Sequence, residues 1–209
     1  QQFFNMATGY ASPKKWNSLS VAPYNLRNDI ISLINNEIEF KKNGKESEIW
    51  LKCNSLIDEM IINKLYEASN AGVKVELIVR GVCCLRPQVP GLSDNINVRS
   101  IVGRFLEHSR IYCFSNGYKI PSNKTKVFIA SADIMPRNFD RRYEVMVPIL
   151  NATVHKQILN QIMVANLKDN TCLRHCSYTS AGSCGRSCAQ AALRATQVGL
   201  VHAVLSGVA

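Results

Sequence analysis

Basic side chains and one histidine gather in three short segments of this 209-residue sequence. The segments hold Arg80 at the end of an apolar run, then Arg104, His108 and Arg110, then Arg137, Arg141 and Arg142. One guanidinium group can donate two parallel hydrogen bonds to phosphate oxygens, and it stays charged throughout the physiological pH range. A histidine among them can donate or accept a proton, or act as a nucleophile toward phosphorus. These residue types predict a site for a phosphorylated ligand.

Acidic residues near these segments offer a plainer interpretation of part of the pattern. Some of the arginines can simply form ion pairs, and Glu144 can brace an arginine or the histidine. The acidic residues concerned are Glu107, Asp133, Asp140 and Glu144.

An alternating series of helices and strands must position the basic residues. Apolar residues at helical spacing predict helices over 25–42, 56–70 and 153–167, and Asn54 or Ser55 is expected to cap the second. Apolar runs predict strands over 48–53, 73–79, 96–102, 109–114, 126–131 and 143–149, with a polar arginine-rich loop over 133–142. This order indicates an α/β fold, a sheet flanked by helices. Ligands bind such sheets near the strand ends, where the candidate residues lie.

The chain is basic, with 25 Lys and Arg residues against 15 Asp and Glu residues and a net charge of +10. This charge favours a polyanionic partner, namely phosphates, nucleic acid or an anionic membrane. With 46% hydrophobic residues, the chain can bury one core, which argues against a disordered or fibrous protein. No run of about 18 uncharged apolar residues occurs, so no membrane-spanning helix is predicted. The lack of a basic, apolar leader argues against secretion.

Composition changes abruptly after Asn170, and we predict a boundary there. Residues 171–209 contain no Asp, Glu or Lys. They hold half of the eight cysteines, namely Cys172, Cys176, Cys184 and Cys188. Their spacing fits a zinc site only loosely, because the loop between the two pairs is short, and we predict no metal site. The other four cysteines lie in or beside apolar segments and are expected to be reduced and buried.

Five segments of the sequence resemble the bacterial-type polyphosphate kinase family. They are 51–58 (LKCNSLID), 77–87 (LIVRGVCCLRP), 98–112 (VRSIVGRFLEHSRIY), 131–138 (SADIMPRN) and 162–170 (IMVANLKDN). The resemblance extends over residues 1–170 and implies a phospholipase D-like fold, with two such domains facing each other across an active site. Residues 1–20 are then the end of the preceding catalytic domain, and 21–170 form the C-terminal catalytic domain. Residues 171–209 are an atypical tail, translated out of frame or disordered.

The family transfers the γ-phosphoryl group of ATP reversibly to inorganic polyphosphate through a phosphohistidine. The resemblance places that nucleophile, an aromatic residue that stacks on adenine and the Mg²⁺ site in the preceding domain. This chain alone is therefore expected to be inactive. Arg80 and His108 match nucleotide-phosphate contacts, with His108 as a general acid–base, and Arg137 matches a phosphate contact. Arg110 completes a His-x-Arg motif where phospholipase D enzymes have His-x-Lys, and Ser131, Asn138 and Glu144 echo their downstream pattern.

The resemblance also implies ligands, partners and a location. We expect ATP or ADP and polyphosphate as ligands, the rest of the kinase chain and a homo-oligomer as partners, and no nucleic acid. The expected location is the cytoplasm, or the periphery of the inner membrane.

Two other functions stay open. One is a phospholipase D-like phosphodiesterase or nuclease with His108 as nucleophile, although no lysine follows two residues later. The other is a non-catalytic basic module that binds nucleic acid. Such a module needs aromatic residues among the basic ones, and the Arg137 loop offers only Phe139.

Overall fold

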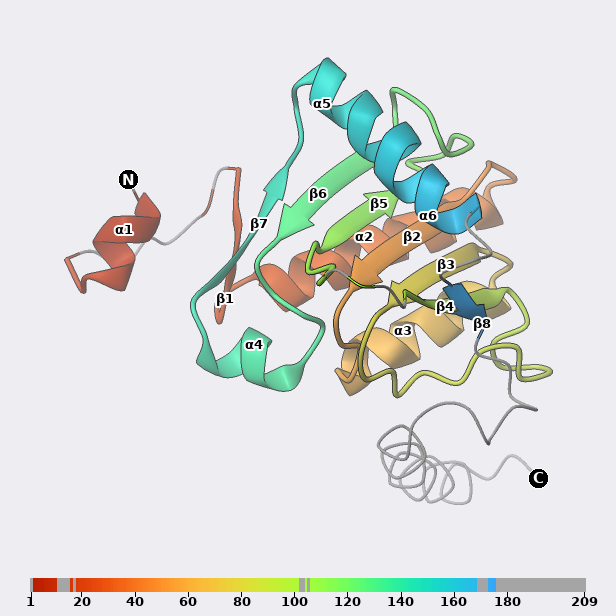
Figure 1. Ribbon diagram of the computed structural model, residues 1–209, viewed down its shortest axis with the longest axis horizontal. Coiled ribbons are helices and arrows are strands. Elements are labelled where there is room, and N and C mark those ends of the chain that lie inside the picture. The colour runs from red at the N-terminus through yellow and green to blue at the C-terminus, as the bar shows by residue number, and fades with distance from the viewer. Residues whose placement is uncertain are drawn as a thin grey trace.

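Eight strands form one mixed sheet in the computed structural model of this protein, which describes residues 2–10, 16, 18–101, 104, 106–168 and 173–175. The order across the sheet is β1-β7-β6-β5-β2-β3-β4-β8 (Figure 1). Strands β2, β3 and β4 are parallel, and the other neighbouring pairs are antiparallel. The strands are β1 (Ser20–Ala22), β2 (Glu48–Cys53), β3 (Lys74–Val79), β4 (Ile96–Ile101), β5 (Ile111–Phe114), β6 (Lys126–Ala130), β7 (Glu144–Pro148) and β8 (Leu173–His175).

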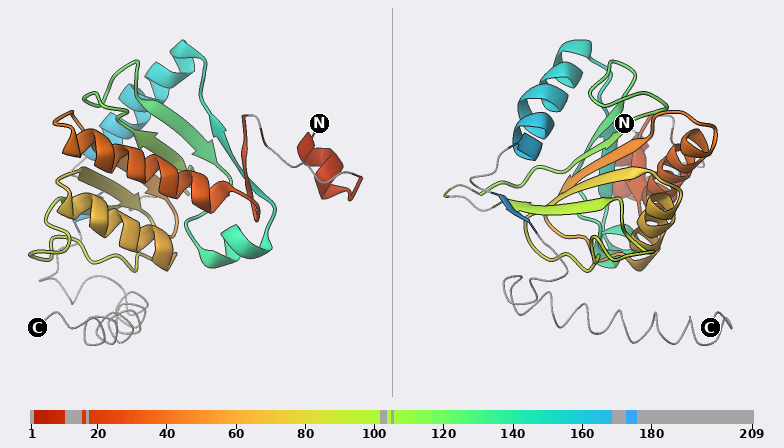
Figure 2. Two further views of the ribbon diagram at one scale, coloured as in Figure 1. Left: turned by 180° about the vertical axis from the view of Figure 1, so that it is seen from behind. Right: turned by 90° about the vertical axis from the view of Figure 1, so that its right-hand side faces the viewer.

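Helices cover both faces of this sheet (Figure 2). One face is covered by α2 (Leu26–Lys42) and α3 (Glu59–Asn70). The other face is covered by three consecutive elements, namely α5 (Ala152–Gln157), the π-helical turn η1 (Ile158–Met163) and α6 (Val164–Lys168). The N-terminal helix is α1 (Gln2–Ala7), and the short α4 (Pro136–Arg141) joins β6 to β7. No helix in the described part of the chain has the length and apolar character needed to cross a membrane.

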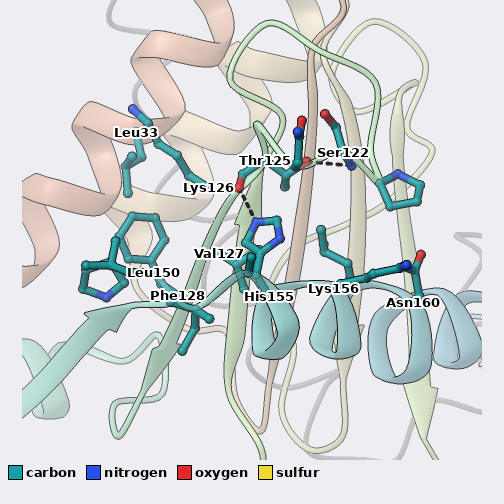
Figure 3. A pocket seen from close by; sticks show the side chains of 16 residues that line it. Leu33, Ser122, Thr125, Lys126, Val127, Phe128, Leu150, His155, Lys156 and Asn160 are labelled. Carbon is teal, nitrogen blue, oxygen red and sulfur yellow. Dashed lines mark hydrogen bonds between the residues drawn. The ribbon is translucent and has the colours of Figure 1, made fainter.

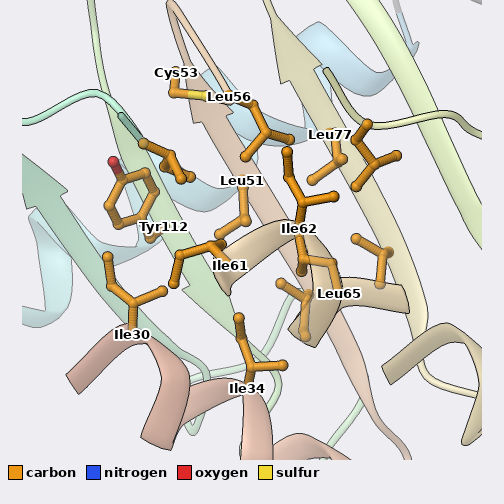
Figure 4. Close-up of a cluster of buried hydrophobic side chains, with 14 of the residues drawn as sticks. Ile30, Ile34, Leu51, Cys53, Leu56, Ile61, Ile62, Leu65, Leu77 and Tyr112 are labelled. Atoms are coloured by element: carbon orange, nitrogen blue, oxygen red, sulfur yellow. The ribbon is translucent and has the colours of Figure 1, made fainter. Parts of the chain in front are cut away.

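The larger hydrophobic core lies between the sheet and the helices α2 and α3 (Figure 4). Side chains of a strand alternate between the two faces of a sheet, so Leu51 of β2 and Leu77 of β3 point toward these helices. Ile30 and Ile34 of α2 and Leu65 of α3 meet them, and all five side chains are buried. This packing fixes the strands whose ends carry the candidate residues.

A smaller core fills the opposite face of the sheet. Trp50 and Ile111 pack there with Leu159 and Met163 of η1. Trp50 belongs to this core while its neighbour Leu51 belongs to the larger one, as the alternation of a doubly covered strand requires. The prediction of a sheet flanked by helices is therefore confirmed.

The start of the second predicted helix, at residue 56, is wrong. Helix α3 begins at Glu59, and its cap is Asp58 instead of the predicted residues 54–55. The Asp58 carboxylate accepts the N–H of Ile61 at 3.1 Å, which satisfies one of the free donors of the first turn. Leu56 stays outside the helix because its N–H donates to a carbonyl of a neighbouring loop at 2.8 Å.

The segment predicted as an arginine-rich loop contains the helix α4. Pro136 takes the first helical position, where its missing N–H costs nothing. Met135 before it is extended, as a residue before proline prefers. Phe139 is only 2% exposed, so its side chain anchors this short helix to the core.

Strand β8 lies in the stretch predicted to be a tail. It pairs antiparallel with β4, with His175 opposite Arg99. The remainder of residues 171–209, including all four of its cysteines, lies outside the described residues. The boundary at residue 170 and the nature of the tail stay predictions.

The four cysteines of the body have reduced thiols. Cys53 and Cys113 are buried, as predicted, and burial raises the pKa of both thiols. Cys83 and Cys84 are only half-buried, because they lie in the loop that follows β3 instead of inside a strand.

A buried carboxylate fastens α2 to the loops at one end of the sheet. Glu37 is 1% exposed, and it accepts hydrogen bonds from the hydroxyls of Ser47 at 2.8 Å and Ser115 at 2.5 Å. The N–H of Asn116 donates to its other oxygen at 2.7 Å. Three donors thus compensate for the loss of water around a buried charge.

We expect Glu37→Ala to lower the free energy of unfolding by about 2–4 kcal/mol, because three donors lose their acceptor. Glu39→Ala is the matched control on the same helix, since Glu39 is 63% exposed and pairs with Lys42 at the surface. Its loss should stay below about 0.5 kcal/mol. Urea unfolding of both variants measures the difference, and equal losses would contradict this role of Glu37.

Candidate functional site

The strand register brings five polar residues to one end of the sheet. Strands β2 and β3 are parallel and end together, so Asn54 and Arg80 leave the sheet side by side. Strand β5 runs in the opposite direction, so Arg110 precedes it at that same end. Asp133 follows the end of β6, and Glu144 begins β7. We call this end of the sheet the site edge.

The carboxylate of Asp133 connects two strand ends at the site edge. Its Oδ1 accepts the N–H of Asn54 at 2.8 Å and the Nε–H of Arg110 at 3.0 Å, and its Oδ2 accepts from Nη2 of Arg110 at 3.0 Å. Burial works to raise the pKa of Asp133, but the hydrogen bonds and charge of Arg110 outweigh burial and hold that pKa below its ordinary value. This pair therefore stays ionised at neutral pH.

The guanidinium of Arg110 also holds His108. Nη1 lies 3.2 Å from Nδ1 of the imidazole, and Nη2 lies 3.2 Å from Nε2. Nη1 in addition donates to the carbonyl oxygen of His108 at 3.2 Å. These contacts orient the ring, and the side chain is otherwise exposed and can be reached by a ligand.

Glu144 joins β7 to the segment that follows β6. The hydroxyl of Ser131 donates to its Oε2 at 2.5 Å, and Nδ2 of Asn138 donates to its Oε1 at 3.1 Å. Arg142 is more distant, with Nη1 4.0 Å from Oε1. Glu144 thus binds a hydroxyl and an amide, and it also forms a long ion pair with an arginine, as the sequence suggested. Ser131 and Asn138 of the predicted downstream pattern both donate to its carboxylate.

Two arginines of the predicted site keep their charge uncompensated. Within the described part of the chain, the guanidinium groups of Arg80 and Arg137 form no ion pair or hydrogen bond. Arg80 is half-buried at the end of β3, and Arg137 is exposed in the first turn of α4. Both are therefore free to bind an anion.

Gly81 is needed for the close approach of the β2 and β3 ends. Its N–H donates to the carbonyl oxygen of Asn54 at 2.7 Å. A Cβ at this position would lie 2.8 Å from the same oxygen, so any side chain would push the two loops apart. Arg80 keeps its place beside Asn54 because the next residue is glycine.

Two buried amide atoms at the site edge lack a hydrogen-bond partner among the described residues. They are Nδ2 of Asn54 and Oδ1 of Asn138. An unpaired buried polar group costs stability unless water or a ligand satisfies it. The site edge therefore has hydrogen-bonding capacity beyond that of its arginines.

Lys52 is a residue of this region that the sequence analysis did not single out. Its side chain is 2% exposed, and Nζ donates to Oδ1 of Asn166 at 2.6 Å and lies 3.4 Å from the carboxylate of Glu107. Burial lowers the pKa of Lys52 against the attraction of Glu107. Lys52 thus links the segment before His108, which it contacts through Glu107, to α6, which it contacts through Asn166. A lysine inside an otherwise apolar strand was the signal for such a buried partner.

A cavity of about 860 Å³ opens at the opposite end of β6 (Figure 3). Its lining includes Lys126, Phe128 and Leu150 but none of the predicted site residues. His155 is half-buried in this lining, with Nε2 2.6 Å from the carbonyl oxygen of Thr125. This cavity lies apart from the site edge, where His108 and Arg137 are open to solvent.

The fold is similar to that of the phospholipase D family. A phospholipase D family member, Nuc from Salmonella typhimurium, superposes with a TM-score of 0.50 at 16% identity, over 77% of this chain and 98% of that one. The polyphosphate kinase of Porphyromonas gingivalis superposes with a TM-score of 0.79 at 42% identity, over 85% of this chain and 26% of that one.

Sequence comparison agrees with the second of these structures. A family model described as polyphosphate kinase C-terminal domain 2 matches residues 19–192. The polyphosphate kinase of Erythrobacter litoralis is 53% identical over 81% of this chain, and that of Halalkalibacterium halodurans is 48% identical over 80%. The chain belongs to the polyphosphate kinase family. It spans about a quarter of the length of these relatives, 24% and 23%.

We expect Asp133→Asn to destabilise the protein, because the guanidinium of Arg110 loses its charge partner. The lowered pKa of Asp133 sets the pH dependence. Its stabilising contribution is complete above about pH 3.9, the ordinary value, and is lost as the pH falls through the lower folded value.

Urea unfolding of wild type and variant from neutral to acidic pH measures this difference. The gap in unfolding free energy should stay constant at neutral pH and close only below about pH 3.9. Asp94→Asn, in an exposed loop, is the control and should show little loss. A gap that is absent at neutral pH would contradict the role of Asp133.

Proposed function

We propose that this chain supplies one wall of a polyphosphate kinase active site, which transfers the γ-phosphoryl group of ATP reversibly to inorganic polyphosphate. The observation that carries this proposal is the set of free cations at the site edge of a member of this family. Arg80 and Arg137 have no counter-ion among the described residues, and Arg110 holds an exposed His108 at the same end of the sheet. The phosphohistidine nucleophile belongs to another domain in this proposal.

The chemistry of phosphoryl transfer suits such a wall. Charge spreads over the oxygens of the transferred group in the transition state, so catalysis depends on positioning and charge stabilisation. Each guanidinium can donate two parallel hydrogen bonds to phosphate oxygens. Because Arg80 and Arg137 are unpaired, they bind a phosphate without first breaking an ion pair.

His108 is the proposed proton carrier of this wall. An imidazole can give a proton to, or take one from, a terminal phosphate oxygen during transfer in either direction. Arg110 keeps the ring in place, and Asp133 keeps Arg110 in place. In this proposal Arg110, Asn138 and Glu144 are positioning residues, since their polar groups are engaged with neighbours.

The carboxylates at the site edge are poor candidates for holding Mg²⁺. Asp133 is bound by Arg110 and Asn54, and Glu144 is bound by Ser131 and Asn138. Over the described ranges, no group of three His, Cys, Asp or Glu side chains could hold a metal ion. We therefore assign no step of the reaction to a metal held by these residues, and propose that the other domain binds Mg²⁺.

The open shape of the site edge supports a second wall from outside these residues. His108 and Arg137 are exposed, and a phosphoryl-transfer site must exclude water when it reacts. We propose that the remainder of the kinase chain supplies the facing surface, within a homo-oligomer in the cytoplasm or at the periphery of the inner membrane.

The two other functions have less support. Arg110, at the position where phospholipase D enzymes have lysine, is engaged by Asp133 through two hydrogen bonds. Phe139 is buried under Arg27, so it has no face available for stacking on a base. Neither a nuclease nor a nucleic-acid-binding module is favoured by these contacts.

We expect Arg80→Ala and Arg137→Ala each to weaken the binding of inorganic tripolyphosphate to this chain by about 10-fold, the loss typical of a charged hydrogen bond. Isothermal titration calorimetry at fixed salt measures the affinity. Lys124→Ala is the matched control, since it removes the same charge from an exposed loop at the opposite end of β6. An equal loss in the control would show that only net charge matters.

We expect the 209-residue chain alone to transfer no radiolabelled γ-phosphate from ATP to polyphosphate, because the proposed nucleophile is elsewhere. A full-length polyphosphate kinase serves as the positive control in the same assay. If the wild-type chain transferred phosphate and His108→Ala abolished the transfer, the proposal that the nucleophile lies in another domain would be refuted.

A further inference from the structure

Arg27, in the first turn of α2, contacts residues on two other helices. Nη1 and Nη2 donate to the two carboxylate oxygens of Asp140 at 2.6 and 2.8 Å. Nε and Nη2 donate to Oδ2 of Asp58 at 3.1 and 3.0 Å. The guanidinium also lies 5.3 Å from the centre of the Phe139 ring.

We infer that Arg27 is a positioning residue for the phosphate site: it fixes α4 and thereby the place at which Arg137 presents its guanidinium. This inference rests on the proposed function of the site edge. Arg27 itself is engaged with carboxylates and does not contact the ligand in this scheme.

The helix α4 depends on contacts outside itself. It has six residues, and a single helical turn is not stable alone in water. Asp140 and Phe139 attach it to Arg27, and Asn138 attaches it to Glu144. Arg137 lies in the same turn, so the direction of its exposed side chain follows the placement of the helix.

The contact geometry requires arginine at position 27. The planar guanidinium of Arg27 donates four hydrogen bonds to two carboxylates, and its face covers an aromatic ring. A lysine ammonium carries the same charge but lacks this fork. The Asp140 side chain is 49% exposed, and the hydrogen bond from Arg27 lowers the pKa of its carboxyl group.

A double-mutant cycle separates positioning from general stability. The variants are Arg27→Lys, Arg137→Ala and the two combined, each titrated with inorganic tripolyphosphate. If Arg27 acts through Arg137, Arg27→Lys weakens binding by about 5-fold in the wild type but by less than about 2-fold in Arg137→Ala. Lys42→Arg, another charge-conserving change on α2, is the control and should leave the affinity unchanged.

A second variant covers the case in which Arg27→Lys does not fold. Asp140→Asn breaks only the link to α4 and leaves the Arg27–Asp58 pair that borders the α3 cap. It should reproduce the same non-additive loss with Arg137→Ala. Hydrogen exchange should also quicken at the N–H groups of Asn138 and Phe139, which donate to the carbonyl oxygen of Met135, the residue that precedes α4.

The outcomes distinguish this inference from the function on which it rests. If the wild-type chain does not bind tripolyphosphate, the proposed function and the inference both fail. If Arg80→Ala weakens binding while Arg27→Lys and Asp140→Asn do not, only the inference fails. Losses that add fully in the cycle would likewise overturn it, because Arg27 would then act independently of Arg137.

Discussion

The ion pair of Asp133 and Arg110 is the interaction on which the site edge depends. The sheet has a parallel half and an antiparallel half, and its ends at this edge belong to strands that run in opposite directions. Asp133 bonds to the backbone after β2 and to the side chain before β5, so it fixes one half against the other. Arg110, held in this way, in turn contacts and positions the imidazole of His108. An exposed imidazole is positioned here because its partner is itself held by a half-buried carboxylate.

Four arginines at or near the site edge fall into two groups, those paired with carboxylates and those without such a partner, and net charge alone does not distinguish the groups. Arg27 and Arg110 are each bound by carboxylates and act as fasteners between elements. Arg80 and Arg137 have no such partner in the described part of the chain. The fasteners hold the backbone from which the free arginines project. A positive site of this kind is built by pairing some of its cations and leaving the others free.

Much of this arrangement could be predicted from the sequence, because apolar runs and helical spacing are local signals. They predicted the strands β2 to β7 but not β1 or β8, and the strand ends then indicated where the candidate residues converge. The helix α4 was not predicted, since six residues are too few to show helical periodicity. Arg27 was not singled out because its partner Asp140 is 113 positions away. Lys52 likewise pairs with a segment that only the folded sheet brings near it.

Gly81 limits which side chains can be introduced at the site edge to contact a different ligand. A side chain at that position meets the carbonyl of Asn54, so the loop after β3 cannot be enlarged there to contact a new ligand. The opposite border, formed by α4, carries Arg137 with its side chain exposed to solvent. The space around the backbone therefore restricts position 81 to glycine, whereas the side chain at position 137 projects into open solvent.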